Sequence, residues 1–225
     1  MQSLKLIDKK QNPSLGFNAE RYELDEYGSE HIHLKNDSKE IVFMVMFRTI
    51  PESSSGVAHI LEHTTLCGSE NYKVRDPFFM MLRRSMSTFM NAFTASDWTA
   101  YPFATQNKKD FFNLLDVYLD AVYFPILAEE DFKQEGHRIE FSKYDKSNSP
   151  LEYKGVVFNE MKGSMSNIQS ITWQALTKSL FPDLTYRHNS GGDPETILEL
   201  THDYLKGFHK KFYHPSNATY FTWGN

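Results

Sequence analysis

The sequence predicts an α+β protein in which an antiparallel β-sheet of about five to six strands packs against several α-helices. Strand-like segments near the N-terminus are followed by helices, two further strands, a run of helices and one last strand. A parallel α/β fold would instead show a regular alternation of strand and helix. The 225 residues are 40% hydrophobic and 24% charged, as in ordinary globular proteins, and the 15% of aromatic residues indicates a large aromatic core.

The predicted strands are segments with alternating or β-rich composition. Turn signals at Tyr27-Gly28 and Asn36-Asp37 separate the first three of them. A last strand, NATYFTWG, runs up to the end of the chain. The predicted strands cover residues 19–25, 29–36, 40–48, 88–94, 98–104 and 217–224.

The helices are predicted from apolar periodicity and from capping residues. Asp76 followed by Pro77 marks one helix start, and Asn107 caps a long amphipathic helix that ends at Pro125. Gly68 ends the helix that comes before these two in the sequence. The predicted helices cover residues 55–66, 77–86, 108–124, 129–142, 151–165, 168–180 and 194–213.

Bulk properties exclude several classes of protein. The net charge of −5 argues against a nucleic-acid partner, and no apolar run is long enough for a transmembrane helix. Cys67 is the single cysteine, so it cannot form an internal disulfide bond. Because the N-terminus resembles neither a signal peptide nor a transit peptide, we expect a cytoplasmic protein of bacterial type, or one of the mitochondrial matrix or another organelle if a presequence has been removed.

The segment His59-Ile60-Leu61-Glu62-His63 carries the strongest chemical signal. Histidines four residues apart lie on the same face of a helix, where two imidazoles can bind one metal ion. Glu62 would then lie beside the metal and hold a water molecule, as in the H-x-x-E-H motif of the inverzincins. Two surface histidines beside a carboxylate are the alternative. The surrounding residues are mostly apolar and small, which disfavours it, because burying these three side chains without a metal would be costly.

A catalytic zinc needs a third protein ligand and an open position for water. Glu160 is the most suggestive candidate, because it follows the apolar run VVF and could face inward. Glu152, two turns earlier on much the same predicted helix face, is expected to orient a histidine ligand. Spacing alone leaves the third ligand open among Glu129, Glu130, Glu135, His137, Glu140, Glu152 and Glu160.

Several longer motifs resemble the pitrilysin-type zinc peptidases, and among them the branch of presequence proteases and falcilysin. The matching blocks occur in the same order from about residue 15 onward. They are GVAHILEHTTLCGS (56–69), DPFF (76–79), STFMNAFTASDWTAYPFATQNKKDFFNLLDVYLDAVYFP (87–125), GHRIEF (136–141), LEYKGVVFNEMKG (151–163) and the HPSNATYFTWGN ending.

The resemblance implies a domain like those of pitrilysin and mitochondrial processing peptidase, with one Zn²⁺ per chain. By resemblance the ligands are His59, His63 and Glu160, and Glu62 is the general base. Glu140 fits the shorter ligand spacing found elsewhere in the wider family, but the NEMKG context favours Glu160. The strand residues Asn91 and Ala92 correspond to positions that bind the peptide backbone of the substrate.

The implied activity is endoproteolysis of short unstructured peptides, including presequences. Members of this branch are much longer than 225 residues, so the chain is expected to be one zinc-bearing N-terminal domain (1–225) of a four-domain protein. Its partners would be unfolded peptides and the remaining domains of the parent chain. The alternatives are a non-catalytic structural relative, a fragment that binds zinc but lacks the substrate-clamping second half, and a regulatory zinc module with four protein ligands.

Overall fold

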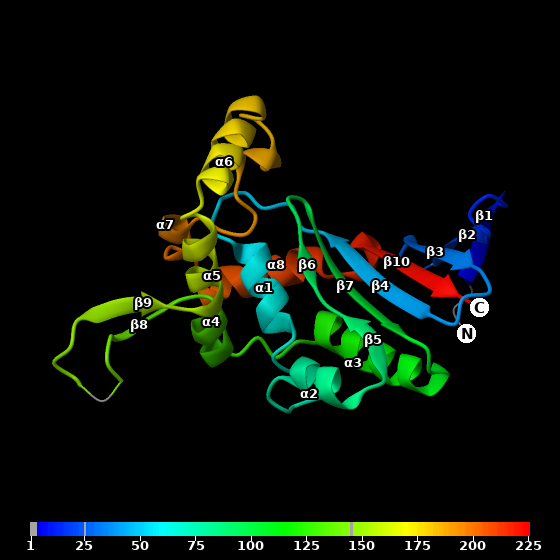
Figure 1. Ribbon diagram of the computed structural model, residues 1–225, viewed down its shortest axis with the longest axis horizontal. Helices are drawn as coiled ribbons and strands as arrows, with labels where there is room; N and C mark the ends of the chain where they lie inside the picture. Colours follow the sequence, from blue (N-terminus) through cyan, green and yellow to red (C-terminus); the bar gives the residue numbers. More distant parts are fainter. Residues whose placement is uncertain (1–3, 25, 145) are drawn as a thin grey trace.

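The computed structural model describes residues 4–24, 26–144 and 146–225. Within these ranges the chain forms an eight-stranded sheet, a separate two-stranded hairpin and a set of helices (Figure 1). The strands of the sheet are β1 (Leu4–Asn12), β2 (Phe17–Leu24), β3 (Ser29–Lys35), β4 (Ile41–Arg48), β5 (Ser87–Met90), β6 (Phe93–Thr94), β7 (Trp98–Thr105) and β10 (Ala218–Gly224). The hairpin consists of β8 (Arg138–Phe141) and β9 (Leu151–Lys154). The helices are α1 (Val57–Thr65), α2 (Pro77–Arg84), α3 (Lys108–Tyr123), α4 (Glu129–Glu135), α5 (Val156–Ser164), α6 (Ile168–Leu180), α7 (Pro194–Ile197) and α8 (His202–Phe212), with 3₁₀ turns η1 (Thr185–Arg187) and η2 (Pro215–Asn217).

The α+β class is confirmed, but the sheet is larger than predicted. Its strand order is β1-β2-β3-β10-β4-β7-β5, and β6 also pairs with β7. The charged segment of β1 shows little of the apolar alternation that marks a strand, and the predicted strand 88–94 is divided into β5 and β6. The pair β3–β10 is parallel, because the last strand enters the sheet between β3 and β4 after the whole helical region.

The hydrophobic core lies between the central strands and the helices. Along β4, the side chains of Phe43, Val45 and Phe47 are buried, and the alternate residues are only half-buried. This period of two places one face of the sheet against the helices. Buried residues of α3, among them Leu114 and Tyr118, belong to the same core. The core therefore holds α1 and α3 in fixed positions relative to the sheet.

Three predicted helices are interrupted in the structure. The segment 129–142 is helical only as far as Glu135 and continues into β8, and the segment 151–165 begins with β9 before α5 starts. The predicted helix 194–213 is two helices, because the side chain of Thr201 accepts a hydrogen bond from the Tyr204 amide and caps α8. In contrast, α6 covers the predicted residues 168–180, and the Asn107 side chain caps α3 as predicted.

The start of α2 also differs from the prediction. Asp76 occupies the N-cap position, but its φ of 54° is left-handed and its side chain makes no capping hydrogen bond. Its backbone amide instead donates to the Cys67 carbonyl. Asp76 thus closes the loop between α1 and α2 through its backbone.

The β8–β9 hairpin and α6 project away from the body of the molecule (Figure 1). Along α6 none of the described residues is buried. No helix within the described ranges is both long enough and apolar enough to cross a lipid bilayer.

A close backbone contact joins the end of α4 to the start of α5. A Cβ atom at Gly155 would lie 1.9 Å from the carbonyl oxygen of Gly136, so only glycine fits there without a backbone shift. Neither glycine has helical backbone angles, with φ −79° and ψ −92° at Gly136 and φ 165° and ψ 152° at Gly155, so both predicted helices are interrupted there. The contact also sets the position of α5 relative to α4.

We expect Gly155→Ala to destabilise the protein by about 3 kcal/mol, because the added methyl group must displace backbone atoms. The matched control is Gly163→Ala on the same helix, where an added Cβ would meet nothing within 4 Å. That control should be neutral or stabilise the helix by up to about 1 kcal/mol. Chemical denaturation measures both values, and equal stability of the two variants would contradict the proposed contact.

Candidate metal centre

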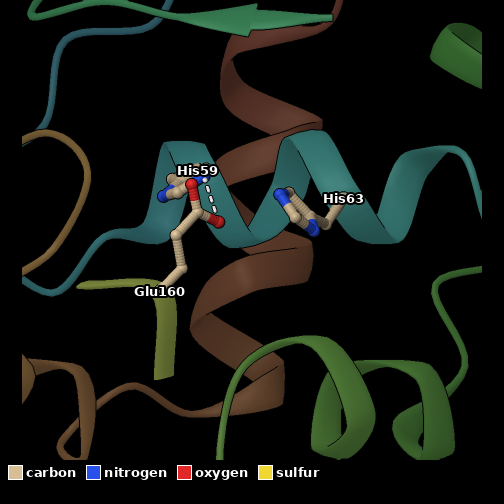
Figure 2. Close-up of side chains that lie close together, drawn as sticks. All are labelled: His59, His63 and Glu160. Atoms are coloured by element: carbon tan, nitrogen blue, oxygen red, sulfur yellow. Dashed lines mark ion pairs between the residues drawn. The ribbon is translucent and has the colours of Figure 1, made fainter. Parts of the chain in front are cut away.

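Helix α1 presents His59 and His63 from a largely buried position. The residues around them, among them Ile60 and Leu61, are fully buried in the core, whereas the two histidines are only half-buried. Their ring centroids lie 5.0 Å apart, as expected for residues one helical turn apart. Figure 2 shows both imidazoles on the same side of the helix.

The ring of His59 is oriented by a backbone carbonyl. Its Nδ1 lies 2.9 Å from the carbonyl oxygen of Gly191, in the loop before α7. Because a carbonyl can only accept, Nδ1 carries the hydrogen and Nε2 keeps a free lone pair. This close approach also depends on Gly56, which has a φ of +68° and where a Cβ would lie 2.9 Å from the Gly191 oxygen.

The ring of His63 is oriented by a buried carboxylate. Its Nδ1 lies 3.0 Å from Oε2 of Glu135, the last residue of α4. Burial on its own would raise the pKa of Glu135, but the hydrogen bonds from His63 and Gln134 outweigh it and lower that pKa. Glu135 is therefore ionised at neutral pH and accepts the Nδ1 hydrogen of His63, so that in the neutral imidazole Nε2 carries the lone pair.

Glu160 reaches the histidines from α5. Its Oε2 lies 3.7 Å from Nε2 of His59, and the side chain is 56% exposed (Figure 2). The Glu160 carboxylate approaches His59, as expected for an inward-facing residue. However, Glu160 is not part of the buried face of α5, which consists of Val157, Phe158 and Met161. The carboxylate lies on the open side of the cluster.

His59, His63 and Glu160 together have the donor set of a zinc site. One ligand atom from each lies within 4.8 Å of the other two, and within the described part of the chain no other group of three such side chains does so. Two histidines and one glutamate are a known set of protein ligands for catalytic zinc. Both Nδ1 atoms are held by acceptors, so the residues present fit this metal.

Glu62 lies next to the cluster of His59, His63 and Glu160 but is not one of its members. Its Oε2 accepts a hydrogen bond of 2.5 Å from the Thr94 hydroxyl on β6. With His63 it lines a cavity of about 400 Å³, to which Phe78 and Phe79 of α2 contribute apolar walls. A carboxylate in this position can hold a water molecule next to the ligands.

Asn91 and Ala92, which were predicted to lie on a strand, line the same cavity. They connect β5 to β6, and the Asn91 side chain accepts a hydrogen bond from the Ala92 amide. The carbonyl of Asn91 accepts a hydrogen bond from the buried Tyr118 hydroxyl. The connection between β5 and β6 is therefore anchored beside Glu62.

Glu152 does not lie on the helix of Glu160. It lies on β9 opposite Glu140, so the predicted shared helix face does not exist. The carboxylate hydrogen-bonded to His63 is that of Glu135 instead. A helical spacing argument failed here because Gly155 separates strand from helix.

Other candidates for the third ligand have different partners. Glu140 forms ion pairs with Arg138 and Lys154, and Glu129 forms one with Lys133. His137 is hydrogen-bonded through Nε2 to the Leu200 carbonyl. The Gly191 contact was not predicted, although the Gly191-Gly192 pair is a signal for close backbone approach.

Comparison with known proteins identifies the family of this chain. The profile of the family described as Insulinase (Peptidase family M16) matches residues 48–171. The chain belongs to this peptidase family. The match includes α1 with its two histidines and α5 with Glu160. The resemblance noted from the motifs is confirmed by this match.

Similar proteins include mitochondrial presequence proteases. Those of Xenopus tropicalis and Mus musculus are each 55% identical over 213 residues, which cover 95% of this chain and 21% of the relative. The chain thus spans about a fifth of the length of these relatives. Among solved structures, that of pitrilysin has a TM-score of 0.74 and 18% sequence identity to this chain. The match covers 100% of this chain and 23% of the pitrilysin chain. The structure of a protease from Helicobacter pylori has a TM-score of 0.72 and 17% identity, and the match covers 100% of this chain and 46% of that protease chain. These structures share the insulinase-family fold.

We expect Glu135→Gln to lower the zinc affinity of this insulinase-family chain about 10- to 100-fold, because His63 loses the carboxylate that orients its ring. Isothermal titration with zinc measures the change. Glu152→Gln is the control, since this exposed residue lies on β9 and should leave the affinity unchanged. A larger loss from Glu152→Gln than from Glu135→Gln would contradict the assignment.

Proposed function

We propose that this insulinase-family chain is the zinc-bearing part of a metalloendopeptidase that degrades short unstructured peptides. The observation that supports it most is the convergence of His59, His63 and Glu160, with both imidazole Nδ1 atoms held by acceptors. This arrangement leaves both Nε2 atoms free to bind one Zn²⁺. The open side at Glu160 leaves room for water and a peptide.

Zinc bound to these residues would polarise a scissile carbonyl and make water more acidic. Glu62 accepts the proton of the attacking water and transfers it to the leaving amine. Its position one residue before His63 and beside the shared cavity supports this role. A carboxylate can act in both proton transfers because it alternates between ionised and protonated forms.

Peptide binding is proposed along the connection from β5 to β6, at Asn91 and Ala92. These residues lie at the edge of the sheet, next to Glu62 and the cavity. An extended peptide that adds to a sheet edge is recognised through its backbone, so its sequence matters little. Unstructured peptides, including presequences as the names of the relatives suggest, fit this mode of binding.

The remaining domains of a longer parent protein are proposed partners. The chain covers 21% of the similar presequence proteases, and we infer that domain 1–225 works within a four-domain protein that completes the substrate chamber. Those relatives are named as mitochondrial, which favours a mitochondrial location over the cytoplasmic one expected from the N-terminus. A non-catalytic relative is the alternative, but the complete set of His59, Glu62, His63 and Glu160 favours the enzyme.

Glu62→Gln should lower the kcat for peptide cleavage about 100- to 10,000-fold, because the amide cannot take up the proton of water. Zinc content should stay near that of the wild type, since Glu62 is not a ligand. Glu160→Gln is the paired variant and should lose zinc as well as activity. Metal analysis and cleavage of a quenched peptide by the full-length parent measure both effects, and full activity of Glu62→Gln would exclude the proposed base.

A second experiment compares this chain with its full-length parent. We expect both to bind about one Zn²⁺. Only the parent should cleave the peptide efficiently, because the chain alone lacks the rest of the substrate chamber. The absence of zinc from both proteins would overturn the metal site, and a zinc-loaded parent without cleavage would favour the non-catalytic relative.

A further inference from the structure

We propose that Thr94 is a positioning residue for Glu62, and that it couples the orientation of the general base to the strand that receives the peptide. This inference rests on the proposed function. It concerns a side chain that contacts neither the metal ligands nor the reacting atoms. The juxtaposition that supports it is between β6 and the half-buried turn of α1 that carries Glu62.

The contact between the two side chains is short and directional. The Thr94 hydroxyl donates to Oε2 of Glu62 at 2.5 Å, and both residues are half-buried. A hydrogen bond to a charged acceptor is stronger than one between neutral groups. The hydroxyl takes one acceptor site of Oε2 and fixes the plane of the carboxylate, and the remaining acceptor sites, including those of Oε1, can take a proton from water.

Glu62 needs such a contact because its surroundings are open. The side chain has several rotatable bonds and borders a cavity of about 400 Å³. A flexible carboxylate in that space would sample rotamers that point away from the ligands. A general base works only when it lies within hydrogen-bonding reach of the proton that it removes.

The strand that carries Thr94 is also part of the proposed peptide-binding edge. Within the described ranges β6 pairs with β7 alone, through Phe93 opposite Ala100 and Thr94 opposite Thr99. The amide of Ala95 donates to the Trp98 carbonyl, which closes the turn between the two strands. A peptide that adds to the free edge would restrain β6, and through the Thr94 hydroxyl it would restrain Glu62 as well.

The chain contains a matched contact away from this site. The Thr88 hydroxyl on β5 donates to Oε2 of Glu40 at 2.7 Å, and this pair is exposed. Thr88→Val removes a hydrogen bond of the same chemical type without touching Glu62. It therefore controls for the general effect of replacing threonine on an edge strand.

The test uses the zinc-loaded full-length parent with Thr94→Val, Thr94→Ser and Thr88→Val. We expect Thr94→Val to lower kcat about tenfold, which corresponds to the loss of one hydrogen bond. Its KM and zinc content should remain within about twofold of the wild type, because substrate and metal contacts are unchanged. Thr94→Ser keeps the hydroxyl and should restore kcat, and Thr88→Val should have wild-type kinetics.

Crystal structures of the wild-type parent and Thr94→Val supply a readout that does not depend on cleavage. We expect the Glu62 carboxylate to leave its wild-type rotamer in the variant. An unchanged rotamer overturns the proposal, as does a variant with raised KM and normal kcat, which would make Thr94 a substrate contact. Absence of zinc or of cleavage in the wild type would count against the proposed function instead, and the crystal structures would still decide the role of Thr94.

Discussion

The orientation of two imidazoles on α1 is the constraint on which the rest of the site depends. A helix places His59 and His63 on one face, but it leaves their rings free to rotate and to exchange tautomers. Each Nδ1 is instead held by an acceptor from a distant segment, the Gly191 carbonyl for His59 and the Glu135 carboxylate for His63. Both Nε2 atoms thereby become available on the side from which Glu160 approaches.

These acceptors reach α1 because backbone segments pack without side chains between them. Gly56 allows the loop before α7 to approach the start of α1, and Gly155 allows α5 to start against the end of α4. The buried core of the sheet and α3 supports α1 from the other side. The candidate metal centre is thus assembled from elements that glycines allow to pack closely, and its geometry depends on backbone packing as well as on the three candidate ligands.

The proposed metal ligands and the proposed peptide-binding edge belong to different parts of the fold, and Glu62 lies next to both. The histidines come from α1, and Asn91 and Ala92 come from the connection between β5 and β6. Glu62 lies next to His63 in sequence and is hydrogen-bonded to Thr94 on β6. The Thr94 contact joins the strand to the carboxylate that we propose as the general base.

The sequence by itself determined the α+β class, most elements and the pair of histidines, because these depend on local periodicity and on spacing within one helix. It did not identify Glu135 or reject Glu152, and it missed the parallel pairing of β3 with β10. Those features depend on contacts between segments far apart in the chain. Residue spacing predicts a shared helix face only where the helix is continuous, and Gly155 separates Glu152 from the helix of Glu160. Only the tertiary structure decided which carboxylate reaches His63, because that choice is made by packing between α1, α4 and α5.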